Sequence, residues 1–230
     1  MITWFCEWRD VGGLSTGVSD SDVRAIASLV RICKPIESAT LMRPVPAVDP
    51  HYQDTSKSSC LVMQIDFRDA LSLESALTRS GPLAALCEPM LFPSLSDLKP
   101  TQEVMLGRNY PVARRAQSEG QEIAYLVTYS GPAQDELSWH TSYLARHRVV
   151  LTKLVGIKQL EIFTPAIAVS GLPIPFVRSL QRNRTLFDSA DAMMEAMLSE
   201  VRTELRSDFE NFPPYEGEAR HEPHSLVRIV

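Results

Sequence analysis

The chain has 230 residues, of which 44% are hydrophobic and 22% charged, a composition typical of a globular protein with one large or two small domains. Its net charge of −5 argues against a nucleic-acid partner, because phosphate-binding surfaces carry clustered Lys and Arg. The sequence shows neither a signal peptide nor an apolar stretch of about 20 residues, so we expect a cytoplasmic protein that does not bind membranes.

The four cysteines, Cys6, Cys33, Cys60 and Cys87, are widely and evenly spaced and have unrelated neighbours. This spacing fits neither a CxxC metal motif nor a dense disulfide framework. Because free cysteine is one of the most frequently buried residue types, we expect reduced, buried thiols.

In the first part of the chain, strand-like and helix-like patterns alternate. Strands are predicted over residues 2–8, 37–44 and 61–67, and helices over residues 20–32 and 71–78. A fourth strand near residues 104–106 is only weakly marked. The polar segment 117–121 contains glycine and is interpreted as a linker.

The second part of the chain repeats this order. Strands are predicted over residues 123–129, 157–164, about 176–187 and 225–230, and helices over residues 135–154 and 190–199. Gly156 supplies the break that a helix C-terminus favours. Ser189 can cap the helix that follows it, because its hydroxyl can accept a hydrogen bond from an unpaired first-turn N–H.

An internal repeat relates the two parts. A shift of 120 residues places FRDALSLESAL (67–77) over FDSADAMMEAM (187–197), and a shift of 121 aligns Pro35-Ile36 with Gly156-Ile157. We therefore predict an α+β protein of two tandem ferredoxin-like βαββαβ units, residues 1–116 and 122–230. Helices on one face of each sheet would leave the other face uncovered, and the two sheets can then cover each other.

A short motif in the second unit resembles a known family. Tyr143-Leu-Ala-Arg-His147, followed by Gly156-Ile157 and Phe187-Asp-Ser189, is similar to the Tyr-x-x-x-His, Gly-Leu and Phe-x-Ser elements of the EthD-like branch of the dimeric α+β barrel proteins. The segment Asp208-Phe-Glu-Asn-Phe212 resembles the Asp-x-x-x-Phe segment of that branch. Val149 departs from the pattern, because the family commonly has Pro there, and the helix is expected to continue further.

The resemblance implies a ferredoxin-like fold, two sheets packed face to face into a barrel within one chain, and a small-molecule site inside the barrel that needs no cofactor. It does not imply one reaction, because relatives of this type include isomerases, cyclases, oxygenases, haem peroxidases and accessory proteins. A homodimer of the fused chain is left open.

His140, Tyr143 and His147 fall on one stripe of the predicted helix, at positions i, i+3 and i+7. A partly buried histidine can exchange protons near neutral pH, so His147 is the candidate general acid or base. Tyr143 is its candidate partner, and His140 is a weaker candidate for substrate binding. The alternative interpretation is a solvated or hydrogen-bonded pair of histidines on an ordinary helix.

The first unit lacks these three side chains. The shift of 121 sets Ser19, Asp22 and Ile26 opposite His140, Tyr143 and His147. We therefore expect one site per chain, with reactive groups from the second unit. The first unit would supply apolar cavity wall from Trp4, Phe5 and Met42.

Glu161 shares a strand face with Gln159 and Phe163, and it would orient the substrate or a histidine if that face lines the barrel. A solvent-facing Glu161 is the alternative. No metal site is predicted, because His140 and His147 stand two helical turns apart and cannot chelate one ion alone.

These observations lead to one functional hypothesis and two alternatives. The hypothesis is a cofactor-independent enzyme in which His147 moves a proton on an apolar, aromatic or lactone-like metabolite, in an isomerisation or elimination. One alternative is a non-catalytic accessory protein that binds a small molecule, and the other is a haem-binding barrel with an axial histidine. The sequence has no nucleophile-elbow or phosphate-loop motif.

Overall fold

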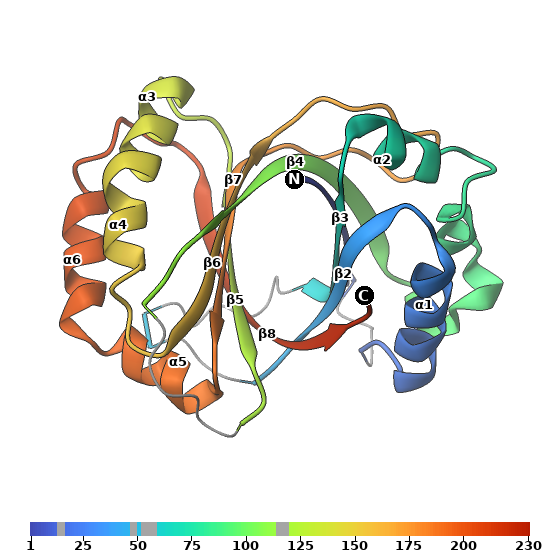
Figure 1. The fold of residues 1–230 in the computed structure, drawn as a ribbon, viewed down its shortest axis with the longest axis horizontal. Helices are drawn as coiled ribbons and strands as arrows, with labels where there is room; N and C mark the ends of the chain where they lie inside the picture. The colour runs from blue at the N-terminus through green and yellow to red at the C-terminus, as the bar shows by residue number, and fades with distance from the viewer. Residues whose placement is uncertain (13–16, 47–49, 52–58, 114–119) are drawn as a thin grey trace.

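The computed structural model describes residues 1–12, 17–46, 50–51, 59–113 and 120–230. In these residues, strands form one closed antiparallel barrel in the order β1-β3-β2-β8-β5-β7-β6-β4. The helices lie outside the barrel in two groups on opposite sides (Figure 1). The predicted fold class, two ferredoxin-like units that share one barrel, is confirmed.

Each half contributes four strands. The first-half elements are β1 (Ile2–Arg9), α1 (Asp20–Ile32), β2 (Ile36–Pro44), β3 (Ser59–Phe67), α2 (Ala70–Ala76), three short 3₁₀ helices (Ala84–Cys87, Pro89–Leu91 and Pro93–Leu95) and β4 (Lys99–Tyr110). The second-half elements are β5 (Ile123–Ser130), α3 (Glu136–Ser142), a π-helical turn (Tyr143–His147), α4 (Arg148–Leu151), β6 (Ile157–Pro165), β7 (Ser179–Phe187), α5 (Ala190–Met197), α6 (Glu200–Phe209) and β8 (Glu218–Arg228).

The last strand of each half is longer than predicted. β4 starts at Lys99 instead of residue 104, and β8 starts at Glu218 instead of residue 225. Both strands carry glutamates that are buried in the barrel, Glu103 and Glu222. Hydrophobic alternation therefore did not mark these strands. The separate helix α6 was also missed, because the prediction for this region ended at residue 199.

The two halves repeat each other in detail. Their sheets have equivalent orders, β4-β1-β3-β2 and β8-β5-β7-β6. Phe67 pairs with Ile36, and Phe187 pairs in the same way with Ile157. The register slips directly after Ile36 and after Ile157, at positions that the internal repeat makes equivalent. Ser189 caps α5 as predicted, since its Oγ accepts a hydrogen bond from Ala192 N.

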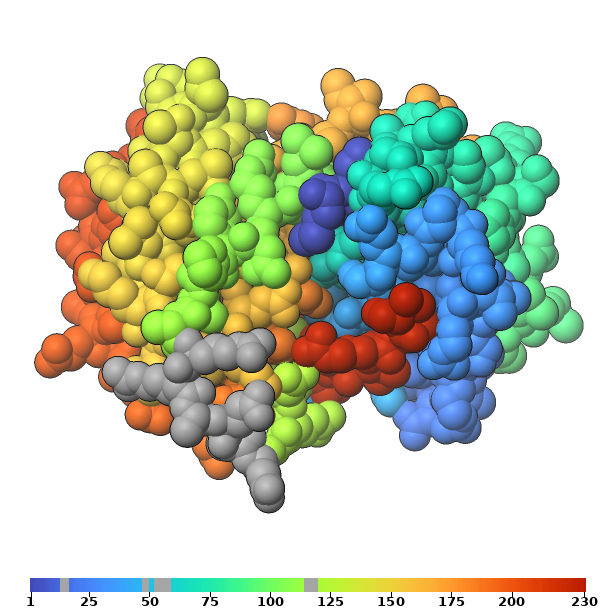
Figure 2. Space-filling model, in the orientation of Figure 1, coloured from blue at the N-terminus to red at the C-terminus, as the bar shows by residue number. Residues whose placement is uncertain are grey.

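Two strand pairs join the halves, β2 with β8 and β4 with β6. In the space-filling view the red C-terminal end of β8 lies against blue residues of the first half (Figure 2). Residues 166–178, between β6 and β7, extend onto the first half, where Leu172 and Ile174 join its core. The predicted linker 117–121 falls largely outside the described residues, which resume at Gly120, so the boundary stays a prediction.

Alternate residues of β1 face opposite sides of the barrel wall. Trp4, Cys6 and Trp8 point outward and pack in the core beneath the first-half helices. Phe5 points inward, into an apolar layer across the middle of the barrel. This layer also contains Met42, Val62, Met105, Ala124, Leu126, Phe163 and Leu186. None of the four cysteines, all of which lie in the described residues, forms a disulfide; Cys6 and Cys33 are buried and the other two are partly buried.

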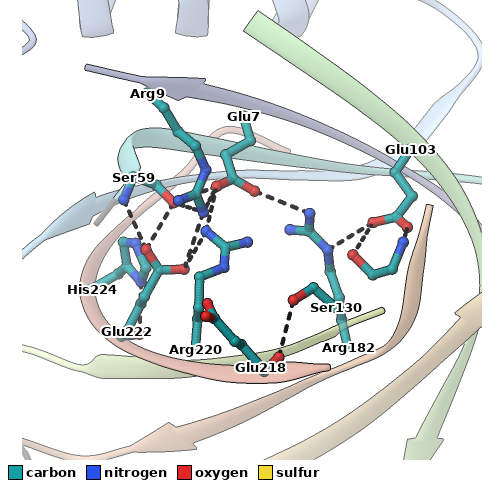
Figure 3. Close-up of polar contacts among 11 residues, drawn as sticks. Glu7, Arg9, Ser59, Glu103, Ser130, Arg182, Glu218, Arg220, Glu222 and His224 are labelled. Carbon is teal, nitrogen blue, oxygen red and sulfur yellow. Dashed lines mark hydrogen bonds and ion pairs between the residues drawn. The ribbon is translucent and has the colours of Figure 1, made fainter. Parts of the chain in front are cut away.

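A cluster of charged side chains also lies inside the barrel (Figure 3). Arg182 of β7 contacts two first-half carboxylates, Glu7 at 3.0 Å and Glu103 at 2.8 Å. Arg9 and Arg220 also pair with Glu7. Burial alone would raise the pKa of Glu7, but Arg182 and Arg220 outweigh this effect and lower it. The barrel interior therefore contains both an apolar layer and a network of paired charges.

Candidate functional site

A cavity of about 90 Å³ lies within the second half, between the outer face of its sheet and the helices that cover it. From β5 it is lined by Tyr125, Val127 and Tyr129, which alternate with the inward-facing Ala124 and Leu126. The other lining residues are Tyr143, His147, Leu151, Leu154, Asn183, Thr185, Met197, Arg202, Leu205, Arg206, Phe209, Ala219 and His221. The expectation that His147 faces the space between the two sheets is therefore wrong, because this cavity lies on the opposite face of the second sheet.

His147 stands in the π-helical turn and is only 6% exposed. Its Nδ1 lies 3.0 Å from Oδ2 of Asp208, a residue of α6. A carboxylate can only accept a hydrogen bond, so Nδ1 carries the proton in the neutral ring and Nε2 keeps a lone pair. Burial lowers the pKa of His147, while Asp208 partly opposes this effect. At neutral pH the imidazole is therefore a base that has its proton-accepting form available.

Tyr143 lies beside His147 in the lining of the cavity, with the two ring centroids 4.7 Å apart. Its side chain is fully buried and stacks on Trp139. Asn183 Nδ2 donates a hydrogen bond to the phenol oxygen at 2.6 Å. Burial raises the pKa of Tyr143 well above its ordinary value, so the group stays a neutral phenol that can donate a hydrogen bond.

Three polar groups of the site were not assigned a role from the sequence. Asp208 was noted only as part of the family-like segment. Asn183 sits in the polar run of β7, where strand alternation does not show which side chain faces a cavity. His221 lines the opposite wall, where its Nδ1 lies 2.9 Å from the Tyr125 hydroxyl. Burial is the main reason that the pKa of His221 is lowered to about 3.

His140 does not line this cavity. Its Nδ1 contacts Gln181 Oε1 at 3.3 Å, and the ring is partly buried against Trp139. The predicted stripe assumed a regular α-helix, but the backbone N–H of Arg148 bonds to the carbonyl of Tyr143, five residues earlier. A π turn holds more residues than an α turn, so it rotates His140 away from the face that carries His147.

Glu161 lies inside the barrel, separate from His147. It is 3% exposed, and its Oε2 lies 2.6 Å from Arg184 Nη2, so the alternative of a solvent-facing Glu161 is wrong. Burial raises the pKa of Glu161 although Arg184 opposes this. Phe5 and Met42 also face the barrel interior, whereas Trp4 faces the first-half helices and donates a hydrogen bond to Gln102. None of these four side chains lines the cavity of His147.

The first half has no counterpart of the His147 and Tyr143 pair. Ile26, at the position equivalent to His147, is fully buried in the first core. Asp22, equivalent to Tyr143, accepts hydrogen bonds from the Ser94 backbone and hydroxyl. Both residues therefore stabilise structure in the first half.

In the part of the chain that the structure describes, no group of three or more His, Cys, Asp or Glu side chains could hold a metal ion. No helix there is long and apolar enough to cross a membrane.

No family model and no curated protein matches the sequence, but solved structures do. An anthrone oxidase-like protein is 11% identical with a TM-score of 0.62, over 98% of this chain and 91% of that one. A provisionally named monooxygenase from Fusobacterium nucleatum is 7% identical with a TM-score of 0.60, over 98% and 92%. A major regulator of staphylococcal pathogenesis is 8% identical with a TM-score of 0.52, over 99% and 100%. At these identities the likeness shows the fold alone: the chain is a dimeric-type α+β barrel whose two units are fused in one polypeptide.

Proposed function

We propose that the chain is a small-molecule enzyme in which His147 removes a proton from an apolar ring substrate bound in the second-half cavity. The observation that carries this proposal is the buried pair of His147 and Asp208 at the wall of that cavity. The carboxylate fixes the ring and its tautomer, as an orienting group does for a general base.

The proposed step is proton abstraction next to a carbonyl. Nε2 of His147 accepts the proton, and the electron pair of the broken C–H bond moves into the carbonyl, giving an enolate. The phenol of Tyr143 can donate a hydrogen bond to the enolate oxygen as its negative charge develops. Return of the proton to another carbon completes an isomerisation, and loss of a neighbouring leaving group completes an elimination.

Oxygenation is the second candidate, and the name of the anthrone oxidase-like structure favours it. The same first step would convert an anthrone-type methylene into a carbanion. Reaction with molecular oxygen would then leave one oxygen atom in the product as a carbonyl and release the other as water. Isomerisation and oxygenation therefore share His147 and differ in the fate of the anion.

The size of the cavity limits the alternatives. An apolar cavity of about 150 Å³ is known to hold benzene, so a ring substrate requires side chains to move from the 90 Å³ seen here. A haem is much larger still and does not fit beside His147 in this arrangement. A non-catalytic function, in which the chain only binds an apolar ligand, is equally compatible with this cavity. Such a function would not require the His147 and Asp208 pair.

The test uses anthrone as a probe in deuterated buffer without oxygen. NMR would follow the loss of the methylene proton signal. We expect the protein to accelerate exchange above the buffer rate, and H147A to lower this acceleration by about 100-fold or more. E204Q, on an exposed side chain of the same helix as Asp208, should exchange like the wild type. Admitting oxygen then shows whether oxygen is consumed. Equal rates for H147A and wild type would remove His147 from the mechanism.

A further inference from the structure

A surface groove adjoins the cavity and shares part of its wall. The groove has a volume of about 540 Å³ and lies along α6. Four side chains line both hollows, namely Met197, Arg202, Arg206 and Phe209. A shift of these side chains would join the two spaces and give a ligand a route from the groove to His147.

The shared wall is basic. Arg202 and Arg206 lie one turn apart on α6, so their guanidinium groups project from the same side of the helix. Among the residues that the structure describes, Glu210 is the one acidic residue that lines the groove, and it forms a long, exposed pair with Arg206 at 3.6 Å. Such an exposed ion pair contributes little free energy. Another anion can therefore readily replace Glu210 beside Arg206. Asp208 lies on the same helix, but it is occupied by His147 and by Arg146.

The positive charge of Arg202 also acts on the cavity interior. After burial, Arg202 contributes to the lowered pKa values of His147 and His221, and it opposes the raised pKa of Tyr143. One guanidinium thus influences three groups, two on the π turn and one on β8. An anion held by Arg202 would lie close to the base.

We propose that the substrate carries an anionic group, such as a carboxylate, on an apolar ring body, and that Arg202 and Arg206 bind this group while the ring enters the cavity. The inference deepens the proposed function by naming the substrate class. It rests on that function only for the statement that the bound ligand is a substrate, because the binding itself does not depend on the reaction. Guanidinium groups bind carboxylates through paired, charge-assisted hydrogen bonds. The side chains of Val127, Leu151, Leu154 and Leu205 offer an apolar surface for the ring.

The test compares two naphthalene probes of similar shape, 2-naphthoate and the neutral 2-naphthylmethanol, by calorimetric titration of the whole chain. We expect the carboxylate to bind at least 10-fold more tightly at low salt, with a smaller difference at high salt because exposed charges are screened. R202Q and R206Q should each reduce the preference. R24Q, on an exposed residue of α1 in the first half, should leave it unchanged.

Folding of each variant would be checked by its thermal transition. R206E provides a second change on an exposed side chain, and it should remove the preference without loss of the fold. H147A should keep the preference for the carboxylate, because binding does not need the base. Equal affinities for the two probes, no binding of either probe, or a preference that survives both R202Q and R206E would overturn the inference. Retained preference with no proton exchange would instead count against the proposed reaction alone.

Discussion

Arg182 of the second half donates its Nε hydrogen bond to Oε2 of Glu103 in the first half, over 2.8 Å and across the interior of the barrel. Arg182 is 1% exposed, and its Nη2 lies 3.0 Å from Oε2 of Glu7. A single cation thus pairs with two buried carboxylates, one from β1 and one from β4. Burial acts to lower the pKa of Arg182, but these carboxylates more than offset it and the pKa is raised.

Replacing Arg182 with an uncharged residue should lower the free energy of unfolding. R182M leaves Glu7 and Glu103 buried without their common partner, and loss of one partner from a buried ion pair costs about 3–5 kcal/mol. We expect the free energy of unfolding, measured in urea, to fall by that amount. Adding E103Q should restore part of the loss, because it removes the buried carboxylate that loses its ion pair with Arg182, whereas Glu7 keeps Arg9 and Arg220. A change below about 1 kcal/mol in R182M would show that the cluster does not hold the halves together.

The matched control is a surface pair. Lys153 and Glu204 form an ion pair at 2.7 Å, but both side chains are about half exposed. Solvent screens such a pair, so K153A should change the stability by less than about 1 kcal/mol.

The protonation of His147 can be tested without a substrate. Burial lowers its pKa, and Asp208 acts in the opposite direction. D208N should therefore lower the pKa further, and the acid limb of any activity profile should move to lower pH. NMR titration of the ring signals would measure both values, with E204Q as the control on the same helix. A rise of the pKa in D208N would contradict the assigned role of Asp208.

Gly156, directly before β6, has a positive φ of 71°. A Cβ at this position would lie 3.0 Å from the Cβ of Ala192 in α5. G156A should therefore lower the stability by about 1–2 kcal/mol through backbone strain, plus a further loss from the contact. Gly17 separates the two effects, because its φ is 90° and a Cβ there would meet no atom of the described residues within 4 Å. Equal losses in thermal stability for G156A and G17A would show that the contact with Ala192 relaxes freely.

The repeated architecture could be predicted because local signals agreed with the tertiary structure. The helix Asp20–Ile32 was predicted with its observed bounds, since Ser19 caps it and an apolar stripe follows. The repeat between residues 67–77 and 187–197 reflects equivalent strand ends and helix starts. These features depend on nearby residues, which a sequence displays directly.

The face of the sheet that carries the site could not be predicted in the same way. Both faces of the second sheet are buried, one by helices and one by the barrel, so hydrophobic alternation does not distinguish Tyr125 from Leu126. The π turn at Tyr143–His147 has no marked sequence signal, and it displaces His140 from the expected stripe. Asp208 meets His147 across 61 positions of sequence, through the packing of α6 on the π turn.

Because β2 closes on β8 and β4 closes on β6, every strand of the barrel already has two hydrogen-bonded neighbours. An open sheet edge is the usual template on which a second chain adds a strand. The fused chain offers no such template in this barrel. If copies of the protein associate, they must therefore meet through their helices and loops, a mode of assembly different from the edge pairing that already joins the two halves.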